Sequence, residues 1–169
     1  KAHFGPVHAS AALKFENTFD RHMCVQYMQG KSPRLAGDSI LTTTATYYGP
    51  AYMITRMSGE LNGVPVESLL LVSHAPNTTE SFDLRFGVMV KLFPGMSKED
   101  SDAMVKGYVA LSQAAFFEDV EVWHTKVRVD NPILCDGDGP INLLRQWYKQ
   151  FYVDIADVPE KWNQAKMYS

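Results

Sequence analysis

The sequence predicts an α+β fold, in which an antiparallel β-sheet packs one face against a long helix in a helix-grip arrangement. Two observations carry this prediction. Segments between residues 42 and 92 are rich in β-branched and aromatic residues, or alternate apolar with polar residues, as strands do. From Ser97 to about residue 126, apolar residues recur at helical spacing. Short turns between the strands favour antiparallel pairing.

Turn signals separate the expected strands. Gly49-Pro50 interrupts the first pair, and Asn62-Gly63 is a strong signal for a two-residue hairpin. The last strand is apolar at alternate positions and therefore buries one face. The expected strands are residues 42–48, 51–58, 64–73 and 82–92, and the alternating positions are Phe82, Leu84, Phe86, Val88, Val90 and Leu92.

Helices are expected on both sides of the strands. Pro6 suits the first turn of a short helix, and Ser97 with Asp100 forms an acidic variant of the capping box at the start of the long one. The expected helices span residues 6–13, 97–126 and roughly 140–154, and the expected loops lie at 30–37 and 130–139.

Size and composition limit the classes of function. The 169 residues are expected to form a single domain, and a net charge of −3 without any basic run argues against a nucleic-acid partner. The longest apolar run, residues 69–72, is too short to span a bilayer. Cys24 and Cys135 form no Cys-x-x-Cys motif and are expected to be reduced thiols in the cytoplasm. Because the chain begins with Lys1, it is expected to be a fragment of a longer protein.

Two histidines and one acid form a candidate metal site. Gly5-Pro6 allows the backbone to turn between His3 and His8, and Asp119 falls on an apolar helical stripe, where a carboxylate is costly unless it is paired or bound to metal. Two imidazoles and a carboxylate hold non-heme Fe(II) with positions open for O2. The alternative is a surface His3, a half-buried His8 and an ion-paired Asp119. The stripe contains Met104, Tyr108, Leu111, Ala115, Asp119 and Val122.

Several segments together resemble a known family over nearly the whole chain. The longest is RVDNPILCDGDGPINLLRQWYKQFYVDIADV, residues 128–158; the others are Ala2-His3-Phe4 with His8, Tyr47-Tyr48-Gly49-Pro50 with Met53-Ile54, Glu67-Ser68, Gly95-Met96-Ser97 and Asp119-Val120-Glu121-Val122-Trp123. The chain is similar to the C-terminal catalytic domain of Rieske non-heme iron oxygenases. Among these it is nearest to the oxygenase components of bacterial 3-ketosteroid 9α-hydroxylases.

The resemblance implies specific site residues. It assigns the catalytic iron ligands to His3, His8 and Asp119, and a substrate-facing set to Gln26, Tyr47, Met53, Thr55, Val72, Phe116 and Trp123. Thr55 and Val72 depart from the family, which tends to carry Asn at both positions, and the loss of an amide removes a hydrogen-bonding group from the pocket wall. Gly5-Pro6 also replaces bulky aromatic residues.

The resemblance also implies an activity and partners. Residues 1–169 would be the catalytic domain of a monooxygenase that hydroxylates a steroid ring carbon, expected at the 9α position of a 3-ketosteroid, with O2. Electrons would come from a Rieske [2Fe-2S] cluster in an N-terminal domain absent from this chain, fed by a flavin and iron–sulfur reductase that uses NADH and FAD. A homotrimer in the bacterial cytoplasm is expected.

Three alternatives remain open from the residues alone. A metal-free lipid- or sterol-binding helix-grip module would have the same architecture. A zinc hydrolase could use the same three ligands to activate water. An oligomerisation domain could retain a vestigial iron site.

Overall fold

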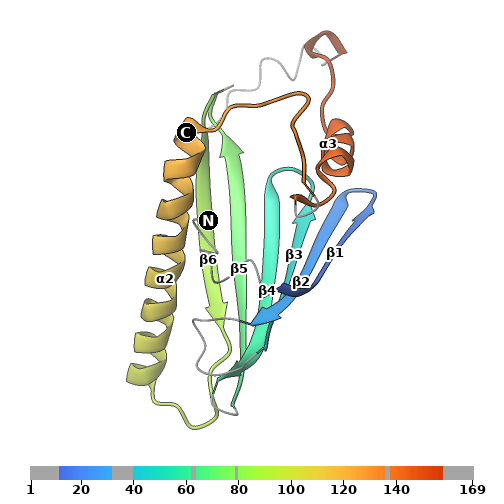
Figure 1. Ribbon diagram of the computed structural model, residues 1–169. Coiled ribbons are helices and arrows are strands. Elements are labelled where there is room, and N and C mark those ends of the chain that lie inside the picture. Colours follow the sequence, from blue (N-terminus) through green and yellow to red (C-terminus); the bar gives the residue numbers. More distant parts are fainter. Residues whose placement is uncertain (1–11, 32–39, 62–63, 79, 136–137, 158–169) are drawn as a thin grey trace.

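The computed structural model describes residues 12–31, 40–61, 64–78, 80–135 and 138–157. Within them, six antiparallel strands form one sheet in the order β1-β2-β3-β4-β5-β6, so every strand pairs with its neighbour in the chain (Figure 1). The strands are β1 (Ala12–Asp20), β2 (Met23–Lys31), β3 (Ile40–Tyr48), β4 (Tyr52–Leu61), β5 (Val64–Pro76) and β6 (Phe82–Val90). With a long helix beside the sheet, this confirms the predicted α+β class.

The four expected strands are all present. Three of them are longer than predicted, since β3 already begins at Ile40, whereas β6 ends at Val90, two residues before its predicted end. β4 continues to Leu61 and β5 to Pro76. Leu61 pairs with Val64, so the connection at Asn62-Gly63 has the two-residue length of a tight hairpin, although these two residues lie outside the described part. Along β6, alternate side chains from Leu84 to Val90 are half-buried, as the pattern predicted.

The β1–β2 hairpin was not predicted. The prediction of a helix at 6–13 is wrong for its last two residues, because Ala12 and Leu13 begin β1. The other residues of that expected helix, 6–11, lie outside the described residues. β2 also extends through Gly30 and Lys31, where a loop was expected. The two strands meet at a turn in which Arg21 takes a positive φ of 49°.

In the part of the chain that the structure describes, two α-helices follow the sheet. α2 (Lys98–Thr125) matches the prediction and runs alongside β6 (Figure 1). α3 (Ile141–Lys149) is shorter than the expected helix at 140–154. It ends in hydrogen bonds of the tighter three-residue kind, from the amides of Phe151 and Tyr152 to the carbonyls of Tyr148 and Lys149. A short 3₁₀ turn, η2 (Ile155–Asp157), comes next.

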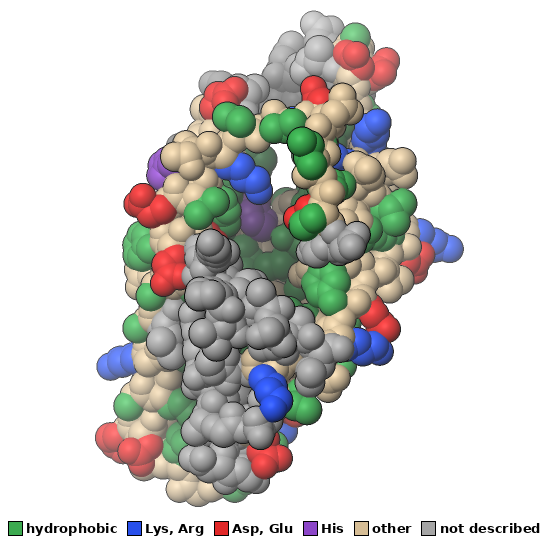
Figure 2. Space-filling model, viewed as in Figure 1, with side chains coloured by type: hydrophobic (Ala, Val, Ile, Leu, Met, Phe, Trp, Pro, Cys, Tyr) green, Lys and Arg blue, Asp and Glu red, His purple; other side chains and the backbone are tan. Residues whose placement is uncertain are grey.

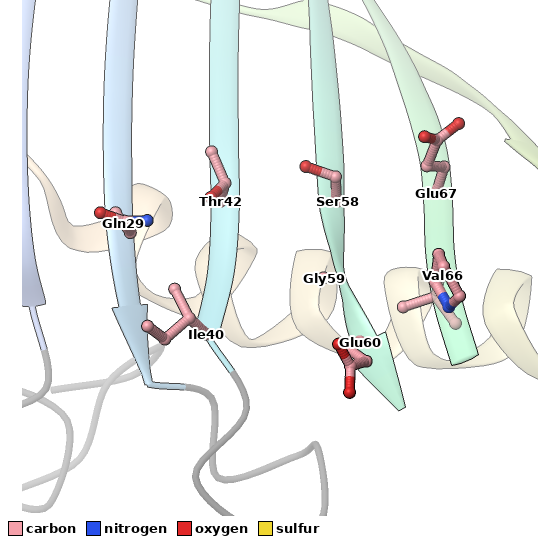
Figure 3. A pocket seen from close by; sticks show the side chains of 9 residues that line it. Gln29, Ile40, Thr42, Ser58, Gly59, Glu60, Val66 and Glu67 are labelled. Atoms are coloured by element: carbon pink, nitrogen blue, oxygen red, sulfur yellow. The ribbon is translucent and has the colours of Figure 1, made fainter. Parts of the chain in front are cut away.

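The two faces of the sheet differ. Ring contacts between α2 and β6 place α2 on the face that carries Tyr47, Met53 and Val72, because paired strand residues point to the same side. On the opposite face, polar side chains such as Gln29, Thr42 and Ser58 line an open depression, with α2 behind the sheet (Figure 3). The apolar α2-facing side is therefore the place to look for the candidate site.

Candidate functional site

The strand residues implied as substrate contacts lie in two adjacent rows on the α2-facing side of the sheet. In the first row Tyr47 pairs with Met53, and Met53 pairs with Val72. In the second row Ala45 of β3 lies between Gln26 and Thr55. Residues as far apart in the chain as Gln26 and Val72 are thus brought onto one continuous surface.

The helical members of the set face the same surface. The Phe116 ring centroid lies 4.9 Å from that of Phe86, which pairs with Val72 and so extends the first row to α2. Two turns further along α2, the Trp123 ring lies 6.2 Å from Phe82 at the start of β6. α2 therefore forms one wall beside the two rows.

The seven residues differ in exposure. Val72 is 1% exposed and Thr55 is 7% exposed, so both belong to the packed floor of this surface. Tyr47, Met53 and Phe116 are half-buried, whereas Gln26 is exposed and Trp123 is 37% exposed. The floor is buried while the margins remain open, which is the exposure pattern expected of a binding surface.

The second wall comes from α3. Trp147 is buried, and its indole Nε1 donates a hydrogen bond of 2.9 Å to the carbonyl of Arg21 in the β1–β2 turn. The Trp147 ring also packs edge-on against Tyr148 and Phe151, each at 4.9 Å between centroids. Figure 2 shows a hollow between α2 and α3, with hydrophobic and histidine side chains visible inside it.

Titratable groups on this surface are held in their neutral forms. Burial raises the pKa of the Cys24 thiol, and burial with the nearby Cys24 raises the pKa of Tyr47. Burial, followed by the influence of Tyr47, raises the pKa of Tyr148 to about 12. Burial lowers the pKa of His74. At neutral pH these side chains offer hydrogen-bonding groups without charge, which suits an apolar ligand with a few polar atoms.

The candidate metal ligands are described only in part. Asp119 is half-buried on α2, three residues after Phe116 and four before Trp123, and therefore lies on the sheet-facing side of the helix. A carboxylate there suits one position of the iron ligand set. His3 and His8 lie outside the described residues. Within the described part no group of three metal-binding side chains is found, and because that search does not reach the two histidines, the ligand set stays a prediction.

The apolar stripe of α2 is interrupted near its C-terminal end. Met104, Tyr108 and Ala115 are half-buried, as expected, but Val122 is 49% exposed, and its place on the stripe was wrong. Every residue from 121 to 130 is exposed. The last turn of α2 is therefore less buried than the regular apolar spacing predicted.

Three residues on this surface were not predicted as part of the site. Cys24 pairs with Tyr47 in the first row, and Tyr148 comes from α3. His74 lies two residues after Val72, so it faces the same side. The alternation of side chains along a strand was the signal that could have identified His74.

These features define a class: an α+β domain with one apolar sheet face, flanked by two helices, arranged to bind an apolar ligand. Comparison with known proteins gives the family. Residues 1–152 match the family model described as "3-Ketosteroid 9alpha-hydroxylase C-terminal domain". The chain belongs to this family.

Relatives of known name agree with the family. The chain is 40% identical over 167 residues to the oxygenase component of 3-ketosteroid-9-alpha-monooxygenase from Rhodococcus rhodochrous, covering 95% of this chain and 44% of the relative. A protein of the same name from Mycobacterium tuberculosis is 37% identical over 93% of this chain and 42% of the relative. A cholesterol 7-desaturase from Caenorhabditis elegans is 36% identical over only 50 residues. The chain spans less than half the length of the first two relatives.

Among the described helices, none is both long and apolar enough to cross a bilayer.

Proposed function

We propose that this chain is the catalytic domain of the oxygenase component of a Rieske-type monooxygenase that hydroxylates a 3-ketosteroid, at the 9α position. The observation that carries the proposal is the α2-facing surface, where Tyr47, Met53 and Val72 form one row and α2 adds Phe116. Two relatives are named as oxygenase components of 3-ketosteroid-9-alpha-monooxygenase, and this chain matches less than half the length of each.

The surface has the properties that a flat apolar substrate needs. Val72 and Met53 present apolar side chains, and the Phe116 ring closes the row from α2. Burial of apolar area contributes about 25 cal/mol per Å² to binding. The neutral phenol of Tyr47 adds a hydrogen-bonding group at the other end of the row. These residues would bind and orient the steroid and exclude water from the carbon that reacts.

The proposed iron ligands are His3, His8 and Asp119, with Asp119 supplied by the sheet-facing side of α2. Fe(II) in such a two-histidine, one-carboxylate site supplies the O2-activating chemistry. The chain's own part is to hold the ring carbon next to this site, by the floor of β4 and β5 and the wall of α2.

Partners and setting belong to the same proposal. A Rieske [2Fe-2S] cluster in an N-terminal domain would deliver electrons, and a flavin and iron–sulfur reductase with NADH and FAD would supply them. The assembly would be a homotrimer in the bacterial cytoplasm. The relatives are named as oxygenase components, which supports a separate reductase partner.

The test is the metal content of Asp119→Ala. We expect the purified wild-type chain, reconstituted anaerobically with Fe(II), to bind one iron per chain by elemental analysis, and Asp119→Ala to bind none while its circular dichroism stays native. Glu118→Ala, which changes an exposed neighbouring acid, is the matched control and should keep the iron.

Other results would point elsewhere. Stoichiometric iron in Asp119→Ala would remove Asp119 from the ligand set. A wild-type chain that binds steroid but no metal would favour the metal-free lipid- or sterol-binding module. A preference for zinc, with hydrolytic activity that needs neither O2 nor reductant, would favour the hydrolase.

A further inference from the structure

His74 is a polar side chain in an apolar part of the α2-facing surface. It lies on β5, two residues after the buried Val72, and pairs with Leu84 of β6. Its ring lies 5.6 Å from Phe82, and the Phe82 ring lies 6.2 Å from Trp123 of α2. His74 is therefore placed between the floor residue Val72 and the α2 wall, on the surface proposed to bind the steroid.

Among the described residues, one nitrogen of His74 has no hydrogen-bond partner. Its Nδ1 atom is buried, and no described residue hydrogen bonds to it. Buried polar atoms are paired in the large majority of cases, so an unpaired one calls for an explanation. A ligand that binds beside the ring is one such explanation, because it supplies the missing partner only when it is present.

The His74 ring packs against apolar neighbours. The Phe82 ring contacts it at a tilt of 56°, and Leu84 lies opposite it across the strand pair. Rotation about the bond between Cβ and the ring is a soft, two-fold torsion, so either nitrogen edge can face a ligand. Burial favours the neutral imidazole, in which one nitrogen donates and the other accepts.

The neighbouring strand residues offer no other polar side chain to a ligand at this end. Val72, Leu84, Phe82 and Phe86 are apolar. Tyr47 lies two strands away from Val72, towards α3. A steroid that spans the surface from α3 to α2 would therefore meet a phenol near one end and His74 near the other.

Resting on the proposed function, we propose that His74 is a specificity-determining residue, whose imidazole hydrogen bonds to a ketone oxygen at one end of the steroid. This role accounts for the unpaired nitrogen. It also supplies a hydrogen-bonding group beside a part of the floor where Val72 can offer none. His74 orients the substrate by this contact and takes no part in the reaction at the ring carbon.

The test compares ketone recognition in His74 variants. Binding of androstenedione and of its 3-deoxo and 17-deoxo analogues is measured by isothermal titration calorimetry with the Fe(II)-loaded chain. The wild type should bind one of the two analogues about three- to tenfold more weakly than androstenedione, the loss expected for one neutral hydrogen bond. His74→Phe should bind androstenedione as weakly as the wild type binds the weaker analogue. This variant should also bind androstenedione and that analogue with equal affinity.

Two further variants make the result specific. His74→Gln keeps a hydrogen-bonding side chain and should recover part of the discrimination, and it also serves if His74→Phe does not fold. His124→Phe changes an exposed histidine on α2 and should behave as the wild type.

The outcomes separate the two proposals. If His74→Phe retains the wild-type discrimination, or if the wild type binds all three steroids equally, the role of His74 is overturned while steroid binding stands. If the wild-type chain binds none of the steroids, both proposals are overturned.

Discussion

Arg21 shows how a single residue can hide a hairpin from sequence analysis. A positive φ is normally left to glycine or asparagine, and the segment between Asp20 and Met23 contains neither. The turn is held from a distance, since the Arg21 carbonyl accepts hydrogen bonds from Trp147 Nε1 at 2.9 Å and from Gln150 Nε2 at 2.8 Å. Neither donor could be foreseen from the local sequence, so β1 and β2 were missed.

The phenol of Tyr148 gives a prediction on pH dependence. Burial raises its pKa to about 12 from the ordinary 10.0. Above pH 10 the unfolded chain loses this proton first, so the free energy of unfolding falls as pH rises towards 12. Tyr148→Phe removes this contribution, and we expect its stability to fall less steeply than that of the wild type in urea titrations between about pH 9 and 11.5. Tyr52→Phe is the matched control for the loss of one phenol. If the free energy of unfolding falls equally with pH in Tyr148→Phe and in the wild type, the raised pKa of Tyr148 is contradicted.

At the scale of elements, α2 was predictable at both ends while α3 was predictable only at its start. The Ser97 cap is a local signal, and the structure contains it as expected. The C-terminal end of α3 is different, because the apolar spacing continues through Phe151 after the helix has ended at Lys149. Phe151 packs on the buried Trp147, so its apolar character reflects tertiary packing and not helix length.

The N-terminal cap of α2 is expected to carry a measurable part of its stability. Ser97 Oγ accepts a hydrogen bond of 3.1 Å from the Asp100 amide and donates one of 2.7 Å to the Asp100 carboxylate. We expect Ser97→Ala to lower the free energy of unfolding by about 1 kcal/mol in urea denaturation. Ser112→Ala makes the same change inside α2, where the hydroxyl only bonds back to the Tyr108 carbonyl. That control should stay within about 0.5 kcal/mol of the wild type; equal losses in both variants would argue against a capping role.

At the scale of the whole molecule, the candidate site depends on α2 staying in place against the sheet. The sequence predicted that this helix and the sheet would pack together, since both have an apolar face. It could not predict where along α2 each side chain would meet the sheet. Tyr108 contacts β5 at Ser68, Phe116 contacts β6 at Phe86, and Trp123 contacts the start of β6. This alignment sets the position of Asp119, which lies between the last two contacts.

A double-mutant cycle can isolate the contact between Tyr108 of α2 and Ser68 of β5. Their hydroxyl oxygens lie 2.7 Å apart, and Ser68 is 8% exposed. Tyr108→Phe leaves the buried Ser68 hydroxyl without its partner and should cost about 1–2 kcal/mol. Ser68→Ala should cost less, because the Tyr108 hydroxyl keeps a contact of 3.6 Å to Met57 Sδ.

The double variant reports the coupling between the two residues. We expect Tyr108→Phe with Ser68→Ala to be more stable than the sum of the single changes predicts, by about 1 kcal/mol, because neither hydroxyl is then left unpaired. Tyr108→Phe combined with Ser97→Ala is the control pair, and it should be additive because Ser97 lies three turns away along α2. Strict additivity in both pairs would mean that apolar packing alone holds α2, and with it Asp119, against the sheet.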